Sequence, residues 1–280
     1  LDAYGVFWGS SKVGMLPGAK EAMENLIASG KKVGILSNAT QLASKAEEKF
    51  SAHGLNKHTH YNFILTSGEI TKKVLTSQNL PFPTPKQTYY LFGSDHPNFP
   101  SHSILFQDSP YQQVDNLDDA DFIYIHIPHI NGIDQEEAAS FREMVEATTT
   151  RKKLPVLCSN PDQFAHEGSP ARLVVRQGSI AKMFEENDFK VSFIGKPYQY
   201  AYEEAFLQFD GLFRPEEILM IGDTPETDIR GAKEFGMATA LVTKTGIIFE
   251  RLKGNSFDVV VDKLPKSDQP QFFIERLELS

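Results

Sequence analysis

The stretch Ile218-Leu219-Met220-Ile221-Gly222-Asp223-Thr224-Pro225-Glu226-Thr227-Asp228-Ile229-Arg230-Gly231-Ala232 decides how the chain is interpreted. Its apolar start is typical of a buried parallel strand, and the residues after it predict a turn and a helix. Residues just past such a strand lie in the crevice where open α/β sheets bind ligands. Asp223 and Asp228 stand there with no basic residue between them, and two ionised carboxylates repel each other unless a cation holds them together. Such oxygen ligands suit Mg²⁺, although a carboxylate at Asp228 would also favour the helix dipole by itself.

Composition restricts the classes of function. The chain has 280 residues, 40% of them hydrophobic, which is enough for one large or two medium-sized domains. Lys and Arg total 28 against 37 Asp and Glu, so the formal net charge of −9 argues against nucleic acid and anionic membranes as partners. A single cysteine, Cys158, excludes an internal disulfide and favours the cytoplasm. No apolar run is long enough to predict a membrane-spanning helix, and the oligomeric state stays open, a homodimer included.

Short apolar strands alternate with helical segments at both ends of the chain. Residues 32–36 predict a strand that ends in Ser37-Asn38 and is followed by another helical segment. This succession predicts βαβ units and a doubly wound, Rossmann-like α/β core with a parallel sheet. We assign residues 1–80 and 190–280 to this core.

The character of the chain changes at residues 80–85, where three prolines alternate with other residues and predict a stiff linker. We interpret residues 81–189 as a second, inserted α/β cap domain that sets substrate specificity. Residues 135–147 predict a strong helix in this cap. In the returning core, residues 258–261 predict a strand, and Phe272-Phe273 predict a C-terminal helix that packs back.

Four short stretches follow apolar segments and together suit phosphoryl transfer. They contribute Asp2, the pair Ser37-Asn38, Lys196, and the acidic pair Asp223 and Asp228. An aspartate can attack phosphorus and form an aspartyl-phosphate, while a hydroxyl and the free N–H groups of a following helix can cradle phosphoryl oxygens. A lysine places positive charge against the nucleophile and the transferring group, and Mg²⁺ would neutralise and orient both.

These stretches, in this order, resemble the haloacid dehalogenase (HAD) superfamily and, within it, the class IIA NagD-like branch of sugar phosphatases and nitrophenyl phosphatases. The resemblance covers essentially the whole chain. It rests on Asp2-Ala3-Tyr4-Gly5-Val6, Ile35-Leu36-Ser37-Asn38, Gly195-Lys196-Pro197 and the Gly222-to-Asp228 stretch, with support from Leu16-Pro17-Gly18-Ala19, Cys158-Ser159-Asn160-Pro161-Asp162 and Gly178-Ser179-Ile180. It implies a HAD-like core with an inserted cap of the C2 type. It also implies a Mg²⁺-dependent phosphatase for a small phosphorylated metabolite, such as a sugar phosphate or an aryl phosphate.

The resemblance implies a set of metal ligands. Asp2 would be the nucleophile and a ligand, and Asp223 would be the second carboxylate on Mg²⁺. The backbone carbonyl of Tyr4 would be a third ligand, while Asp228 would act directly or through a bound water. Only Leu1 precedes Asp2, although a central strand should lead to it and an empty central slot would expose unpaired backbone. We therefore expect further residues before Leu1.

The resemblance also implies which residues hold the substrate. Ser37 and Asn38 would bind the phosphate, and Lys196 would steady Asp2 and the phosphoryl group. Three residues in predicted cap loops are candidate substrate contacts: Asn160, Asp162 and His129. For the first two an Asx-turn is the rival interpretation, and the loop around His129 either faces the substrate or simply turns the chain.

Tyr4 departs from the family pattern. The hydrolases of this superfamily usually carry there a second aspartate that acts as general acid and then as base. Because general acid–base catalysis contributes about 10²–10⁴-fold, its loss should restrict hydrolysis mainly to good leaving groups, such as aryl, acyl or anhydride phosphates. Two alternatives follow: a phosphate-ester-binding protein with little or no turnover, and a phosphotransferase whose acceptor is not water.

Overall fold

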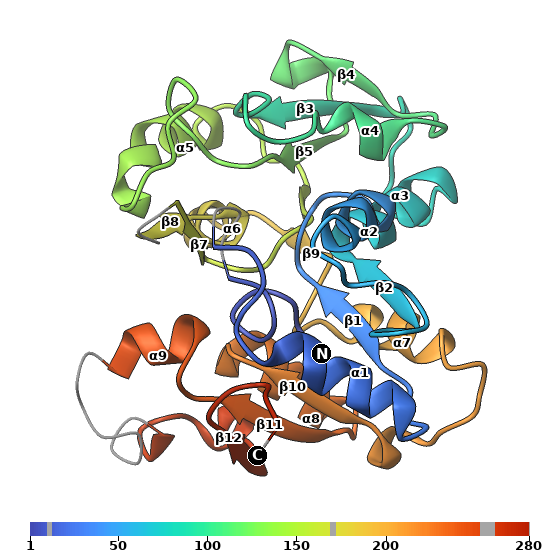
Figure 1. Ribbon diagram of the computed structural model, residues 1–280. Coiled ribbons are helices and arrows are strands. Elements are labelled where there is room, and N and C mark those ends of the chain that lie inside the picture. The colour runs from blue at the N-terminus through green and yellow to red at the C-terminus, as the bar shows by residue number, and fades with distance from the viewer. Residues whose placement is uncertain (10–12, 169–171, 253–260, 280) are drawn as a thin grey trace.

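The structure is a computed structural model that describes residues 1–9, 13–168, 172–252 and 261–279. Figure 1 shows two lobes, and both labelled termini lie in the lower one. The middle of the chain, drawn in green and yellow, forms the upper lobe. None of the helices in the described ranges has the length and apolar character that crossing a membrane requires.

Helices and strands alternate along most of the chain. The α-helices are α1 (Ala19–Ala28), α2 (Ala43–Ser51), α3 (Ser67–Thr76), α4 (Ser103–Phe106), α5 (Arg142–Thr149), α6 (Gln177–Glu186), α7 (Gln199–Leu207), α8 (Arg230–Glu234) and α9 (Gly246–Leu252). The strands are β1 (Gly34–Ser37), β2 (Phe63–Thr66), β3 (Thr88–Phe92), β4 (Gln112–Val114), β5 (Phe122–Ile125), β6 (Val156–Cys158), β7 (Phe164–Glu167), β8 (Arg172–Val175), β9 (Val191–Phe193), β10 (Leu219–Gly222), β11 (Ala238–Val242) and β12 (Phe272–Ile274).

The lower lobe contains a parallel sheet that the first residues of the chain complete. Strand β1 pairs with β2, and β10, β11 and β12 pair in that order, all of them parallel. The amino group of Leu1 donates to the carbonyl of Gly34 at 2.7 Å, and Leu1 accepts from the amide of Leu36 at 2.9 Å. On the other side, the amide of Asp2 donates to the carbonyl of Ile221 at 2.8 Å. The first two residues thus lie between β1 and β10, and the predicted doubly wound α/β core is confirmed.

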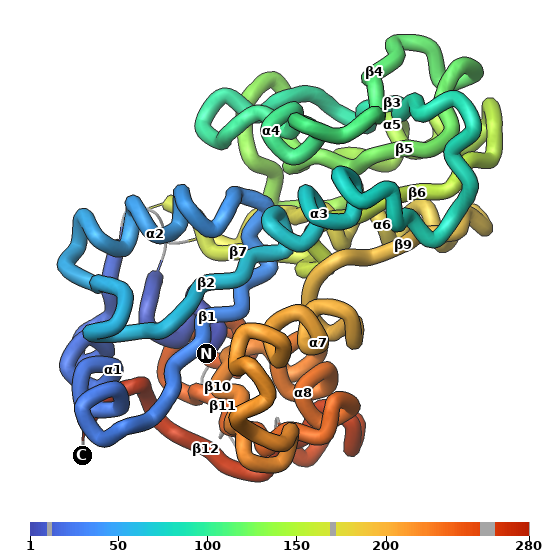
Figure 2. Tube along the Cα trace, turned by 90° about the vertical axis from the view of Figure 1, so that its right-hand side faces the viewer, coloured from blue at the N-terminus to red at the C-terminus, as the bar shows by residue number. Residues whose placement is uncertain are grey.

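Helices cover both faces of this sheet, as the apolar character of its strands requires. On one face, Met23 of α1 and Phe50 of α2 belong to the same buried cluster as Ile35 of β1. On the other face, α3, α7 and α8 contribute to a cluster that includes Tyr202 and Ala232. Figure 2 shows α1 on the opposite side of the core from α7 and α8.

The upper lobe is built on a second parallel sheet, in the order β4-β3-β5-β6-β9. Strands β7 and β8 pair antiparallel with each other in a separate two-stranded sheet. Strand β9 pairs with β6, so this sheet runs on to Phe193, past the boundary at residue 189 that the sequence suggested. The assignment of substrate specificity to this lobe stays a prediction.

Two expected helices differ from the structure. The helix predicted at residues 135–147 begins later, because a 3₁₀ turn (Ala138–Phe141) precedes α5. Phe272 and Phe273 belong to strand β12, which pairs with β11, so the predicted C-terminal helix is wrong. The strand predicted at residues 258–261 lies largely outside the described residues.

Candidate active site

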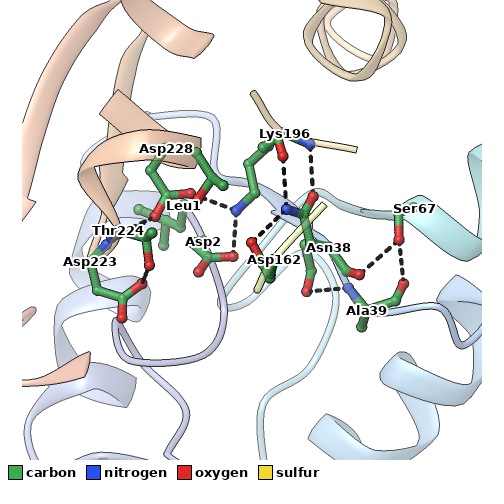
Figure 3. A network of polar contacts seen from close by, with 12 residues as sticks. Leu1, Asp2, Asn38, Ala39, Ser67, Asp162, Lys196, Asp223, Thr224 and Asp228 are labelled. Carbon is green, nitrogen blue, oxygen red and sulfur yellow. Dashed lines mark hydrogen bonds and ion pairs between the residues drawn. The ribbon is translucent and has the colours of Figure 1, made fainter. Parts of the chain in front are cut away.

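A buried lysine joins two carboxylates that are far apart in the sequence. The Nζ atom of Lys196 donates to Oδ1 of Asp2 at 2.6 Å and to Oδ1 of Asp228 at 2.7 Å (Figure 3). Lys196 is only 2% exposed, so this ammonium group has exchanged water for the two carboxylates. These carboxylates also outweigh the effect of burial and raise the pKa of Lys196, which keeps it charged.

The turn after β10 orients Asp228 toward this lysine. Residues Pro225–Ile229 form a single π-helical turn, a rare feature that often marks a functional site. It brings Oδ2 of Asp228 within 3.0 Å of the backbone amides of Asp223 and Thr224, which both donate to it. With Oδ2 held by the backbone, Oδ1 is left for Lys196.

Asp223 is held by the start of α9, the helix that follows β11. The amide of Ile247 donates to Oδ2 of Asp223 at 2.6 Å. A side chain at Gly5 or Gly246 would place its Cβ 2.3 or 2.0 Å from that same oxygen, and both glycines have positive φ angles, +81° and +72°. Only glycine combines that backbone conformation with so close an approach. The turn that contains Gly5 and the start of α9 at Gly246 are therefore both shaped around the Asp223 carboxylate.

Three carboxylates meet here around space that suits a cation. Ligand oxygens of Asp2, Asp223 and Asp228 all lie within 4.8 Å of one another. Burial raises the pKa of Asp2 to about 6, and the charge of Asp228 adds to this while Lys196 opposes it. Burial and the charges of Asp2 and Asp228 raise the pKa of Asp223 well above its ordinary value. One ammonium does not balance three carboxylates, so the donor set fits a hard divalent cation such as Mg²⁺.

Asn38 positions the lysine instead of presenting a free amide. Its Oδ1 accepts from the amide of Lys196 at 2.7 Å, and its Nδ2 donates to the carbonyl of Lys196 and to Oδ1 of Asp162, both at 2.9 Å. These contacts use the side-chain amide group to position Lys196, and the predicted phosphate contact of Asn38 stays a prediction. The Asp162 contact also joins the core to the cap.

Ser37 lies at the end of β1 and lines the same cavity as Asp2. Its Oγ accepts from the amide of Ala39 at 3.3 Å, which leaves the hydroxyl proton available for a phosphoryl oxygen. The sequence suggested that the free N–H groups of the next helix directly follow Ser37. Helix α2 begins only at Ala43, so they do not. Ser67 holds the intervening loop by donating to the carbonyls of Asn38 and Ala39, at 2.8 and 3.0 Å.

The phenol of Tyr4 is engaged by a cation. Nζ of Lys49 donates to the Tyr4 hydroxyl at 2.6 Å and lies 4.8 Å from the centre of its ring. Burial raises the pKa of Tyr4, so the phenol stays protonated at neutral pH and cannot act as a base. Burial lowers the pKa of Lys49 to about 8. The role of the Tyr4 carbonyl as a metal ligand stays a prediction.

The three candidate cap residues fall into two groups. Asn160 and Asp162 line the cavity, and the amide of Asp162 also donates to Oδ1 of Asn160 at 2.9 Å, so the Asx-turn is present as well. His129 does not line the cavity in the described part of the chain. Its Nδ1 accepts from the amide of Gly132 at 2.9 Å and its Nε2 lies 3.2 Å from Oγ of Ser94, so it links its own loop to the loop after β3.

One cavity extends from the carboxylates to the cap. Its volume is about 780 Å³, within the range of small-molecule sites. Asp2, Ser37 and Asp223 line its core end, and His102 and His126 line it on the cap side. The sequence did not single out His102, and it placed His126 in the same loop as His129, which was expected either to face the substrate or simply to turn the chain. The amide of Ile247 was also missed, although Gly246 just after a strand was a signal for a close backbone approach.

Two family descriptions match the sequence. The family of haloacid dehalogenase-like hydrolases matches residues 1–98, and a second family, described as HAD-hydrolase-like, matches residues 193–266. The chain belongs to the haloacid dehalogenase-like hydrolases, as the order of its motifs predicted. No curated protein matches the chain.

Several solved structures are similar in fold to this chain. A possible sugar phosphatase from Cytophaga hutchinsonii is 19% identical, with a TM-score of 0.74 over 100% of this chain and 93% of the other. NagD from E. coli is 16% identical, with a TM-score of 0.65 over 100% and 96%. Glycerol phosphate phosphatase from Mycobacterium tuberculosis in complex with magnesium is 16% identical, with a TM-score of 0.66 over 99% and 73%. At these identities the likeness is one of fold.

Proposed function

We propose that this protein is a Mg²⁺-dependent phosphatase that hydrolyses a small phosphorylated metabolite through an aspartyl-phosphate on Asp2. The observation that carries the proposal is the convergence of Asp2, Asp223 and Asp228 within 4.8 Å, with Lys196 bonded to the first and the last of them. A possible sugar phosphatase, NagD and a glycerol phosphate phosphatase with magnesium share the fold, which supports the same assignment.

Each residue of the site has its own role in phosphoryl transfer. A carboxylate oxygen of Asp2 attacks phosphorus, the bond to the leaving-group oxygen breaks, and water later displaces the phosphoryl group from Asp2 as phosphate. The Lys196 ammonium and the Ser37 hydroxyl hold phosphoryl oxygens and stabilise the charge that spreads over them. Mg²⁺, when bound by the three aspartates, would neutralise the carboxylates and the phosphoryl group.

Phosphate release decides between this function and a silent binding protein. With 4-nitrophenyl phosphate and Mg²⁺, we expect many turnovers per protein molecule, loss of turnover on addition of EDTA, and recovery when Mg²⁺ is restored in excess. Binding of the ester without release of phosphate would instead support a phosphate-ester-binding protein. A screen of phosphorylated metabolites under the same conditions would then rank natural substrates.

Tyr4 should make the rate depend strongly on the leaving group. A phenol that stays protonated and bonded to Lys49 replaces a general acid–base group that contributes about 10²–10⁴-fold. We expect kcat/KM to be at least about 10²-fold higher for an aryl phosphate than for an alkyl phosphate, since only the alkoxide needs a proton to depart. The variant Tyr4→Asp should narrow that gap. Equal kcat/KM values for the two esters in the unmodified protein would contradict this account.

A further inference from the structure

A chain of hydrogen bonds connects the cap to the phosphoryl site. It begins at Asp162 in the cap, whose Oδ1 accepts from Nδ2 of Asn38 at 2.9 Å. Asn38 bonds in turn to the backbone of Lys196, and the Lys196 ammonium donates to Asp2 and Asp228 (Figure 3). One residue, Asn38, therefore separates a cap side chain from the residue whose ammonium holds the nucleophile.

Asn38 fixes the backbone at Lys196. Its Oδ1 accepts from the amide of Lys196 at 2.7 Å and its Nδ2 donates to the carbonyl of Lys196 at 2.9 Å, so the peptide groups on both sides of this residue are held. At Gly195, where φ is +125°, a Cβ would lie only 2.6 Å from Oδ1 of Asn38. Because a lysine ammonium ends a flexible four-carbon stem, its position is defined best where the backbone that carries it is fixed.

Asp162 determines how the side chain of Asn38 is oriented. One hydrogen of Nδ2 goes to the carbonyl of Lys196 and the other goes to Asp162. If Asp162 were removed, a hydrogen of this buried amide would lose its acceptor, which favours rotation of Asn38 away from Lys196. Burial raises the pKa of Asp162 to about 7, yet a carboxyl group keeps an accepting oxygen in either protonation state. The contact therefore does not require charge.

The cap holds Asp162 in place through its own backbone. The amide of Asp162 donates to Oδ1 of Asn160 at 2.9 Å, and its carbonyl accepts from the amide of Gly178 in α6 at 3.0 Å. A Cβ at Gly178 would lie 2.0 Å from the carbonyl oxygen of Pro161, so this loop packs directly against the helix. The position of Asp162 thus follows the position of the cap, whichever substrate is bound.

A positioning role differs from a substrate contact in what it affects. A side chain that touches the leaving group distinguishes one ester from another. Lys196 acts on the phosphoryl group, which every substrate shares, so a residue that positions Lys196 should affect all substrates alike. Its effect should appear in kcat, because the charge on the phosphoryl oxygens is stabilised most in the transition state.

We propose that Asp162 is a positioning residue that acts through Asn38 to hold the Lys196 ammonium in place, so that the cap completes the catalytic site. The inference rests on the proposed phosphatase function. It assigns the cap a part in the rate of phosphoryl transfer itself, in addition to the predicted part in substrate specificity.

Two esters with different leaving groups test the inference. With Mg²⁺, Asp162→Ala should lower kcat by about 10–100-fold for 4-nitrophenyl phosphate, and by the same factor for acetyl phosphate, with little change in KM. Asp162→Asn keeps an oxygen that accepts from Asn38 and should retain most of the activity. The control is Asp121→Ala, which removes another buried cap carboxylate, whose Oδ2 accepts from the amide of Lys86 at 2.8 Å, and it should leave kcat unchanged.

A double-mutant cycle shows whether Asp162 acts through Asn38. Asn38→Ala breaks the connection at its middle residue. In this background Asp162→Ala should lower kcat no further, because two residues of one hydrogen-bonded chain are not independent. Losses that multiply would mean that Asp162 acts on the reaction by another route, and would overturn the inference.

The remaining outcomes separate the inference from the function on which it rests. An unchanged kcat in Asp162→Ala, a change confined to KM, or unequal losses for the two esters would overturn the inference. Equal losses in Asp162→Asn and Asp162→Ala would also overturn it, because the charge would then act instead of the hydrogen bond. In each case the unmodified protein still turns over, and the phosphatase proposal stays intact. If the unmodified protein released phosphate from neither ester, that proposal would fail and the inference with it.

Discussion

Replacement of Asp2 by asparagine should lower kcat by at least about 10⁴-fold, because an amide cannot attack phosphorus as a carboxylate does. Asp2 is the carboxylate that lies both within 4.8 Å of the other two and 2.6 Å from the Lys196 ammonium. The variant keeps an oxygen that can accept from Lys196, so its fold should persist. Release of phosphate from 4-nitrophenyl phosphate with Mg²⁺ measures the effect.

A matched control and a chemical trap make this prediction specific. Asp121 is a buried aspartate of the cap whose Oδ2 accepts from the amide of Lys86 at 2.8 Å, and Asp121→Asn should leave kcat unchanged. In the unmodified protein, rapid quenching followed by borohydride reduction should convert the phosphorylated aspartate to homoserine at position 2, which mass spectrometry detects. Turnover by Asp2→Asn within tenfold of the unmodified protein, or a label at another aspartate, would assign the nucleophile elsewhere.

The sequence was sufficient to predict the core of the site. Buried parallel strands appear as short apolar runs, and the polar residues that end them must gather at one edge of the sheet. That rule brought Asp2, Lys196 and the pair Asp223 and Asp228 together, and the family resemblance then implied the role of each. The ion pairs of Lys196 show that three distant segments do converge.

Loop contacts were beyond such reasoning, because a loop conformation depends on what it packs against. No pattern in the sequence predicts that Lys49 donates to the phenol of Tyr4, or that the side-chain amide of Asn38 hydrogen-bonds to the backbone of Lys196. His129 and His126 lie three residues apart, yet only His126 lines the described cavity. Short apolar runs do not distinguish a helix from a strand either. Two residues, Phe272 and Phe273, are too few to show whether apolar positions repeat with the period of a helix or of a strand. In the structure they pair with β11.

Replacement of Lys196 by methionine should impair both stability and catalysis, because it removes the only ammonium bonded to Asp2 and Asp228 among the described residues. Breaking a buried ion pair by removing one partner costs about 3–5 kcal/mol, since the other charge stays buried and unpaired. Chemical denaturation in EDTA should therefore show a decrease of this size in the free energy of unfolding. With Mg²⁺, kcat/KM should fall by about 10²–10³-fold, the usual cost of losing one donor to the transition-state charge.

The pH dependence of that destabilisation identifies its cause. Burial raises the pKa of Asp2 to about 6 in the unmodified protein, above the ordinary 3.8 of an aspartate, and loss of the opposing Lys196 raises it further. Below pH 6 Asp2 therefore takes up a proton, and the unpaired charge of the variant disappears. The difference in unfolding free energy between Lys196→Met and the unmodified protein should therefore shrink as the pH is lowered from 8 to about 5. Lys153→Met serves as the control, because Lys153 is an exposed residue 3.8 Å from Asp188, and such pairs contribute about 0–1 kcal/mol. If the two lysine variants lost the same stability at every pH, the carboxylates could not be what Lys196 holds together, and its place in the phosphoryl site would be lost with them.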